Sequence, residues 1–162
     1  MRILGIDPGS RVTGYGIIVK QASELGFVTC GTIRTGGERV FSRRLLVIFE
    51  GLCEVIDRHR PDVAAIEDLF LARNPRSALK LGQARGAAVV AAMQHHLDVH
   101  DYTPRMVKQA VAGYGQADKE QVQRMVEILL GLDGSPTSDA ADALAVAICH
   151  ANHADLLAAV PR

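Results

Sequence analysis

Three short apolar stretches follow one another in the first third of the chain, and they limit the fold more than any other feature. The stretches at 2–7, 14–20 and 26–34 are separated by turn-forming residues, of which Pro8-Gly9-Ser10 is the clearest group. In the third stretch, side chains alternate between two faces, with Phe27 and Ile33 on the same one. The pattern predicts three successive strands that form a meander.

Beyond this meander, helical and strand patterns alternate. Apolar residues recur at helical spacing between 40 and 58, and Pro61-Asp62 ends that helix. Thr103-Pro104 and the Asp118–Gln121 pair both have the pattern of a helix start. Further helices are predicted at 77–97, from 103, at 119–132 and at 138–153, and further strands at 63–69 and 99–102.

This order of elements predicts an α/β fold with a mixed central sheet of about five strands flanked by helices. A chain of 162 residues suits one compact domain, and no internal repeat or linker divides it. We therefore expect a single domain over 1–155, followed by a short tail at 156–162. No role for the apolar tail follows from its sequence.

Composition and charge exclude several classes of protein. Three widely spaced cysteines, Cys30, Cys53 and Cys149, argue against a disulfide framework or a zinc site, and we expect them to be buried as small apolar residues. No signal segment and no membrane-spanning stretch is evident, so a cytoplasmic location without membrane contact is expected. The formal net charge is zero, but residues 71–117 are locally basic.

Four carboxylates stand out by their surroundings. Glu67 lies in an apolar predicted strand, where an unpaired charge is strongly unfavourable. Asp7 ends the first strand, and Asp139 and Asp142 lie three residues apart at the start of the last helix, so both face the same way. Each has a structural alternative: Asp7 suits the turn that follows it, and Asp139 suits the positive end of a helix dipole.

Taken together, the four acids favour one metal site. Buried carboxylates that lie close together repel one another, and bound cations relieve this repulsion. Ligands that are all oxygen select hard ions such as Mg²⁺, with Mn²⁺ as a substitute. Two such ions about 4 Å apart suit the hydrolysis of a phosphodiester. We interpret the histidines as surface or interface residues rather than ligands: His59, His95, His96, His100, His150 and His153.

The sequence resembles the RuvC Holliday-junction resolvases over nearly its whole length. The resemblance is carried by ILGIDPGSRVTGYGII at 3–18, AAIEDLFLARNPRSALKLGQARG at 64–86, YTPRMVKQAVAGYGQADKEQVQRMV at 102–126 and SDAADALAVAICH at 138–150. It implies a ribonuclease H-like fold and a homodimer that nicks two strands of a four-way junction symmetrically. It also implies a partnership with the RuvA–RuvB branch-migration complex.

The resemblance assigns site residues as well. The metal-binding and catalytic acids of the family fall on Asp7, Glu67, Asp139 and Asp142, with two Mg²⁺ ions expected. Phe70 corresponds to a ring that stacks on an unpaired base, although an isolated Phe after a strand also suits the core. The remaining predicted DNA-binding residues are Arg73, Arg76, Lys80, Arg105, Lys108 and Lys119.

Lys108 and Lys119 can each hold a phosphate or stabilise negative charge in the transition state, although both also suit a solvated helix surface. Gly82 and Gly86 lie four residues apart on the predicted helix 77–97, where small residues let another backbone approach. By analogy with the family this helix is the candidate dimer interface, while packing on its own sheet explains the spacing equally well.

Two other functions fit parts of the sequence. Asp7-Pro8-Gly9 also suits an ATPase of the actin/sugar-kinase superfold, but a second phosphate-binding hairpin is missing and the chain is short for two lobes. A non-catalytic junction-binding protein would keep the basic loop and lose carboxylates, yet all four acids are present. Assays of ATP hydrolysis and of Mg²⁺-dependent junction cleavage separate the three functions.

Overall fold

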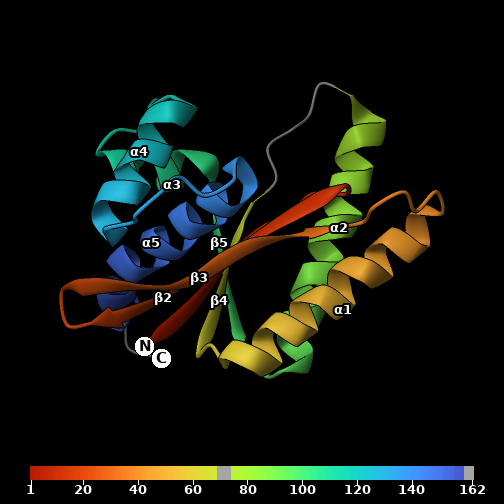
Figure 1. Ribbon diagram of the computed structural model, residues 1–162, viewed down its shortest axis with the longest axis horizontal. Coiled ribbons are helices and arrows are strands. Elements are labelled where there is room, and N and C mark those ends of the chain that lie inside the picture. The colour runs from red at the N-terminus through yellow and green to blue at the C-terminus, as the bar shows by residue number, and fades with distance from the viewer. Residues whose placement is uncertain (69–73, 159–162) are drawn as a thin grey trace.

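The computed structural model describes residues 1–68 and 74–158, with side chains described up to Ala154. Its centre is a five-stranded sheet in the order β3-β2-β1-β4-β5 (Figure 1). Strands β1 (Arg2–Asp7), β2 (Val12–Gln21) and β3 (Glu24–Arg34) form an antiparallel meander. Strands β4 (Val63–Glu67) and β5 (Asp98–Tyr102) continue the sheet in parallel with β1. The predicted mixed sheet is confirmed.

Helices cover both faces of the sheet. Helices α1 (Phe41–His59) and α2 (Pro75–Gln94) lie together on one face (Figure 1). Helices α3 (Pro104–Ala112), α4 (Lys119–Leu130) and α5 (Ser138–Ala158) cover the other, with α5 directly against β1 and β2. In the described part of the chain, none of the helices is long and apolar enough to cross a membrane.

The strand alternation divides the core into two layers. In β1, Ile3 packs towards α5, whereas Leu4 and Ile6 pack towards α1 and α2, and all three side chains are fully buried. This is the two-residue period of a strand covered on both faces. The core is aliphatic, as the composition predicts, and Tyr102 is its one ring-bearing hydrophobic residue among the described positions.

Several boundaries differ from prediction. β2 and β3 are longer, because a tight turn at Ala22-Ser23 joins them without a glycine and Ala22 adopts a φ of 52°. β4 ends at Glu67, so this residue closes the strand instead of lying within it. The continuation predicted to Leu69 lies outside the described residues.

Among the helices, α2 begins at Pro75, two residues before its predicted start, and ends at Gln94 instead of Leu97. The last helix, α5, continues beyond His153 to Ala158. The two predicted helix starts at Thr103 and Asp118 are confirmed. The Thr103 side chain accepts a hydrogen bond from the Met106 backbone, and Asp118 forms a complete capping box with Gln121.

Two expectations about burial are wrong. His150 is not at the surface: it is 3% exposed, and its Nδ1 lies 2.9 Å from the Tyr102 hydroxyl. Helix α5 is packed on nearly all sides, so a position three turns into it lies in the core. Of the cysteines, only Cys149 is buried, whereas Cys30 and Cys53 are partly exposed.

Candidate active site

The four acids lie at one end of the sheet. Ile6 of β1 pairs with Ile66 of the parallel strand β4, so the next residues, Asp7 and Glu67, follow side by side where the two strands end. Asp139 and Asp142 come from the first two turns of α5. All four side chains are partly buried.

Glycines bring α5 close to the strands. Gly14 of β2 is the partner of Asp7 across the sheet, and a Cβ at Gly14 would lie only 1.9 Å from the Asp139 carbonyl oxygen. A Cβ at Gly5 would likewise lie 2.0 Å from the Ala143 carbonyl oxygen. The helix backbone therefore packs directly on the sheet backbone, and this contact sets how near Asp139 and Asp142 come to Asp7.

The surroundings of Asp7 and Glu67 disfavour their charged forms. Burial, followed by the charges of Glu67, Asp142 and Asp139, raises the pKa of Asp7 to about 8. Burial and the charge of Asp142 also raise the pKa of Glu67, while a hydrogen bond with Asp7 and the charges of Lys119 and Lys108 lower it. Both shifts have the causes expected for clustered carboxylates in a partly dry site.

Two lysines complete the lining of this site. Lys119 Nζ donates a hydrogen bond of 2.7 Å to Asp142 Oδ2, and this contact raises the pKa of Lys119. Lys108 lies beside Glu67, Asp142 and Lys119 in the wall of a cavity of about 170 Å³. The cavity is small and is lined by two acids and two lysines, so it suits a single charged group of a larger substrate.

The donor chemistry fits a hard cation. Among the residues that the structure describes, no three Asp, Glu, His or Cys side chains are gathered closely enough to hold an ion as they stand. The same carboxylates repel one another, and Lys119 occupies Asp142. Positive charge at this position would relieve both the repulsion and the burial cost, and carboxylate oxygens are ligands that Mg²⁺ prefers.

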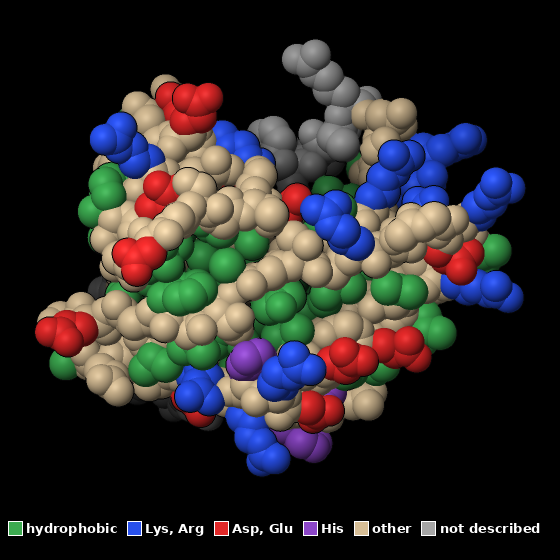
Figure 2. Space-filling model, in the orientation of Figure 1, with side chains coloured by type: hydrophobic (Ala, Val, Ile, Leu, Met, Phe, Trp, Pro, Cys, Tyr) green, Lys and Arg blue, Asp and Glu red, His purple; other side chains and the backbone are tan. Residues whose placement is uncertain are grey.

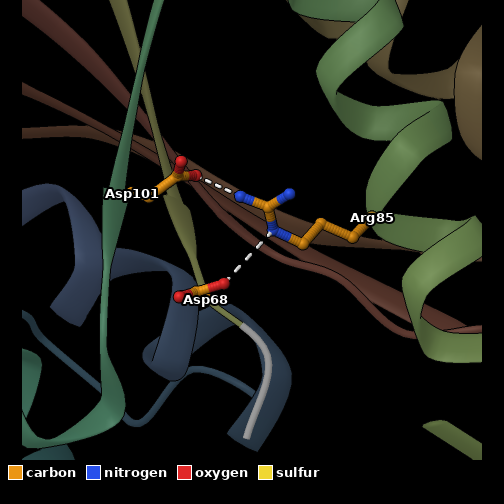
Figure 3. A network of polar contacts seen from close by, with 3 residues as sticks. All are labelled: Asp68, Arg85 and Asp101. Carbon is orange, nitrogen blue, oxygen red and sulfur yellow. Dashed lines mark hydrogen bonds and ion pairs between the residues drawn. The ribbon is translucent and has the colours of Figure 1, made fainter.

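An ion-pair network fixes the chain next to Glu67 (Figure 3). Arg85 of α2 reaches across to β5, where Nη2 binds Asp101, and its Nε lies 4.0 Å from Asp68 Oδ1 (Figure 3). The Asp68 backbone also donates to the Tyr102 carbonyl at 2.8 Å. Asp68 directly follows Glu67, so this network positions the end of β4 and its carboxylate. The sequence shows Arg85 only as one residue of a basic segment.

The other predicted DNA-binding residues are more dispersed. Arg105 is exposed on the first turn of α3, and its side chain packs beside Gly115. Arg76 and Lys80 are exposed in the first two turns of α2, and neither lines the cavity next to the acids. Phe70 and Arg73 lie outside the described residues.

The order of the strands and the helices on both faces of the sheet define a ribonuclease H-like fold, with acids at the ends of β1 and β4. The sequence model of the crossover junction endodeoxyribonuclease RuvC family matches residues 3–150. A family member from Geobacter metallireducens is 60% identical over 156 residues, which cover 96% of this chain and 95% of that protein. The chain therefore belongs to the crossover junction endodeoxyribonuclease RuvC family.

Solved structures agree with this assignment. RuvC of Thermus thermophilus, in complex with a Holliday junction substrate, superposes with a TM-score of 0.90 and 39% sequence identity. The match covers 100% of this chain and 99% of that one. The yeast mitochondrial Holliday junction resolvase Ydc2 is only 12% identical but has a TM-score of 0.69 over 96% of this chain and 81% of its own, so it shares the fold.

Proposed function

We propose that the protein is a Mg²⁺-dependent endonuclease that resolves four-way (Holliday) junctions by paired, symmetric nicks. The observation that carries this proposal is the group of four acids at one end of the sheet, in a chain that belongs to the RuvC family over residues 3–150. The family match does not favour an ATPase of the actin/sugar-kinase superfold or a non-catalytic junction-binding protein.

We propose that Asp7, Glu67, Asp139 and Asp142 hold two Mg²⁺ ions, with Mn²⁺ as a possible substitute. Bound ions of this kind activate a water nucleophile and stabilise the leaving 3′ oxygen of a phosphodiester. The pKa of Asp7, raised to about 8, supports this role, because this acid needs a nearby cation to be fully ionised at neutral pH. Burial and the charge of Asp142 raise the pKa of Glu67 as well.

Lys119 has a second task in this proposal. While no cation is bound, its ammonium neutralises Asp142 at 2.7 Å. If Asp142 held a cation, the Lys119 ammonium in the same site would be available to stabilise negative charge on a bound phosphate. Lys108, in the same cavity wall, holds a neighbouring phosphate oxygen.

We further propose that the protein acts as a homodimer through the outer face of α2. Gly86 is exposed there and a Cβ at that position would meet nothing within 4 Å, so it does not serve packing on its own sheet. Large apolar side chains accompany it: Leu79 is 68% exposed, Val90 56% and Met93 55%. Two equivalent active sites suit a junction with two equivalent strands.

The family resemblance and the proposed substrate suggest a role for Phe70, a partner complex and a location. Phe70 stacks on an unpaired base near the crossover, and the RuvA–RuvB complex is the partner that delivers the junction. We also propose a cytoplasmic location, because the proposed substrate is junction DNA inside the cell.

The decisive experiment compares four-way junction cleavage in Mg²⁺ and in Ca²⁺. We expect paired nicks with 5′-phosphate and 3′-hydroxyl ends in Mg²⁺, and binding without cleavage in Ca²⁺. ATP hydrolysis is measured in parallel and is expected to be absent. Binding of the junction without cleavage in Mg²⁺ or Mn²⁺ would contradict the nuclease and support a junction-binding protein.

A further inference from the structure

A second basic surface lies at the same end of the molecule as the acids but on the α1 and α2 side of the sheet. We call it the arm surface, and it consists of six exposed cationic residues: Arg11, Arg34, Arg39, Arg43, Arg76 and Lys80. Figure 2 shows Lys and Arg side chains gathered on this side of the molecule, around the starts of α1 and α2. The net charge of the whole chain is zero, so this concentration is local.

The contacts between these segments make the surface continuous. Arg34 is the last residue of β3 and pairs with Val12 of β2. The Thr35 backbone N–H donates a hydrogen bond of 3.1 Å to the Arg11 carbonyl, so the β1–β2 turn adjoins the end of β3. Lys80 Nζ lies 5.8 Å from the centre of the Phe41 ring, which brings the start of α2 to the start of α1. These contacts place the three segments that carry the arm surface next to one another in the fold.

Hardly any acid balances this surface. Glu38 is the one acid between Arg34 and Phe49, and its Oε1 accepts a hydrogen bond from the Val40 backbone. Helix α2 has no acidic residue over Pro75–Gln94. In the part of the chain that the structure describes, none of the six cations forms an ion pair with an acid.

Arginines occupy positions at which the helix dipole disfavours a positive charge. The first turn of a helix favours acids, yet α1 and α2 have none there, and Arg43 and Arg76 occupy those turns instead. The acids of α1, Glu50, Glu54 and Asp57, all lie at or beyond its midpoint. Cations that lie near one another and near the positive end of a helix dipole are unfavourable in the isolated domain, so they point to an anionic partner.

We propose that the arm surface binds the sugar–phosphate backbone of one duplex arm of the junction, and that Arg39 and Arg43 at the start of α1 contact a part of that arm beyond the crossover. This inference rests on the proposed function, because the partner is the same DNA that reaches the acids. Lys108, Lys119 and Arg105 lie on the α3 and α4 side of the acids, and the arm surface lies on the opposite side. The scissile strand thus crosses the acids between two basic surfaces, and each surface takes a different arm.

A pair of double variants on the same helix tests the proposal. Arg39→Gln with Arg43→Gln removes two charges from the arm surface, and Arg58→Gln with Arg60→Gln removes two exposed charges from the opposite end of α1. Fluorescence anisotropy in Ca²⁺ gives the affinity of each protein for a four-way junction over a salt series. Junctions with long arms and with arms cut close to the crossover are compared.

We expect the Arg39/Arg43 variant to bind the long-armed junction about 10-fold more weakly, with a slope of log K against log salt that is smaller by about 2, since each phosphate contact contributes about 0.9. The affinity of this variant for the short-armed junction should equal that of the wild-type protein. The Arg58/Arg60 variant should have the wild-type affinity for both junctions. Thermal unfolding of all three proteins checks that the exposed substitutions leave the fold intact.

Two results would overturn the arm surface: an unchanged salt slope in the Arg39/Arg43 variant, or an equal loss in both double variants. Loss of binding to anionic phospholipid vesicles, with junction binding unchanged, would reassign the surface to a membrane. A wild-type protein that binds the long-armed junction with the expected salt slope but never cuts it would contradict the proposed nuclease and leave the arm surface standing.

Discussion

Helix α5 carries two buried polar groups with opposite properties. At its start, Asp139 and Asp142 lie beside Asp7 and Glu67, and burial and the neighbouring carboxylates raise the pKa of Asp7 and of Glu67. Three turns further along, His150 is also buried but is paired with Tyr102 at 2.9 Å. One helix thus contains an uncompensated group of charges and a satisfied neutral pair.

The histidine pair shows what a structural solution to burial looks like. Burial, together with the charges of His100, His153 and Lys20, lowers the pKa of His150 to about 4, so the ring is neutral at pH 7. The His100 ring packs 4.7 Å from it, centre to centre, and burial raises the pKa of Tyr102 to about 12. Burial favours the neutral forms of both His150 and Tyr102, and each side chain is the other's hydrogen-bond partner. The pair therefore needs no bound ligand to compensate for its burial.

The acids are compensated only in part: Glu67 shares a hydrogen bond with Asp7, and Lys119 donates one to Asp142, yet the pKa values of Asp7 and Glu67 stay raised. A folded protein retains such a cost where the charges do something that neutral groups cannot do. We therefore interpret the His150–Tyr102 pair as a structural site and the acids at the start of α5 as a ligand site. The predictions below test this difference.

Removing one carboxylate at the acidic end should have the largest effect. Glu67→Gln or Asp142→Asn keeps the shape of the side chain but weakens its hold on a cation, so we expect cleavage of a four-way junction to fall by about 1,000-fold or more. Junction binding in Ca²⁺ should persist. Nicking by either variant at the wild-type rate would remove that residue from the metal site.

Burial of His150 should make the free energy of unfolding decrease at acidic pH. The folded pKa of His150 is about 4 and its ordinary value is 6.5, so the unfolded chain binds the extra proton between these pH values. Its contribution to stability is complete above pH 6.5 and is lost as the pH falls towards 4, with a limit of about 3 kcal/mol. Urea unfolding at several pH values measures this loss.

The matched variant is His150→Gln, which removes the titration and retains a side chain that can bond to Tyr102. The free energy of unfolding of this variant should depend less on pH between 4 and 6.5 than that of the wild-type protein. Parallel curves for the two proteins would assign the acid sensitivity to other groups.

Neutralising Asp7 should stabilise the metal-free protein while it destroys activity. The folded pKa of about 8 lies above the ordinary 3.8, so stability falls as the pH rises through this window. At pH 8 we expect Asp7→Asn to raise the free energy of unfolding by roughly 1–3 kcal/mol, or about 3–10 °C in Tm. Added Mg²⁺ should raise the Tm of the wild-type protein more than that of the variant.

The smallest effect should come from Tyr102→Phe. This change leaves the buried Nδ1 of His150 without its partner, so we expect a loss of about 1–2 kcal/mol in the free energy of unfolding. Cleavage at saturating Mg²⁺ should stay at the wild-type rate, because the ring lies at the histidine end. A large loss of cleavage with little loss of stability would mean that the two ends of α5 are coupled.

The sequence predicts the sheet, the helices and part of the site. Glu67 and Asp142 stand out because an acid among apolar neighbours contradicts the local pattern, whereas Asp7 and Asp139 suit a turn and a helix start and need the family resemblance. The Lys119–Asp142 contact joins residues 23 positions apart, and local patterns carry no information on such a pair.

The errors have physical causes as well. His150 is buried because α5 packs against the sheet on one side and against α3 and α4 on the other, which a single helix pattern does not reveal. The predicted strands on either side of Ala22 are too short, because a residue other than glycine takes the positive φ in the turn and neither Gly nor Pro marks its position. Arg85 is a bridge between α2, β4 and β5, and its partners become visible only when the strands are paired.

The glycines beneath α5 bear on how variants of this protein are interpreted. Gly14 contacts the backbone of Asp139 so closely that even one added methyl group would push the start of the helix outward. Such a change would leave every charged residue in place and still separate two carboxylates from the other two. A survey of inactive alleles that considers only charged or polar positions would therefore overlook Gly5 and Gly14, where enzyme activity depends on the absence of a side chain.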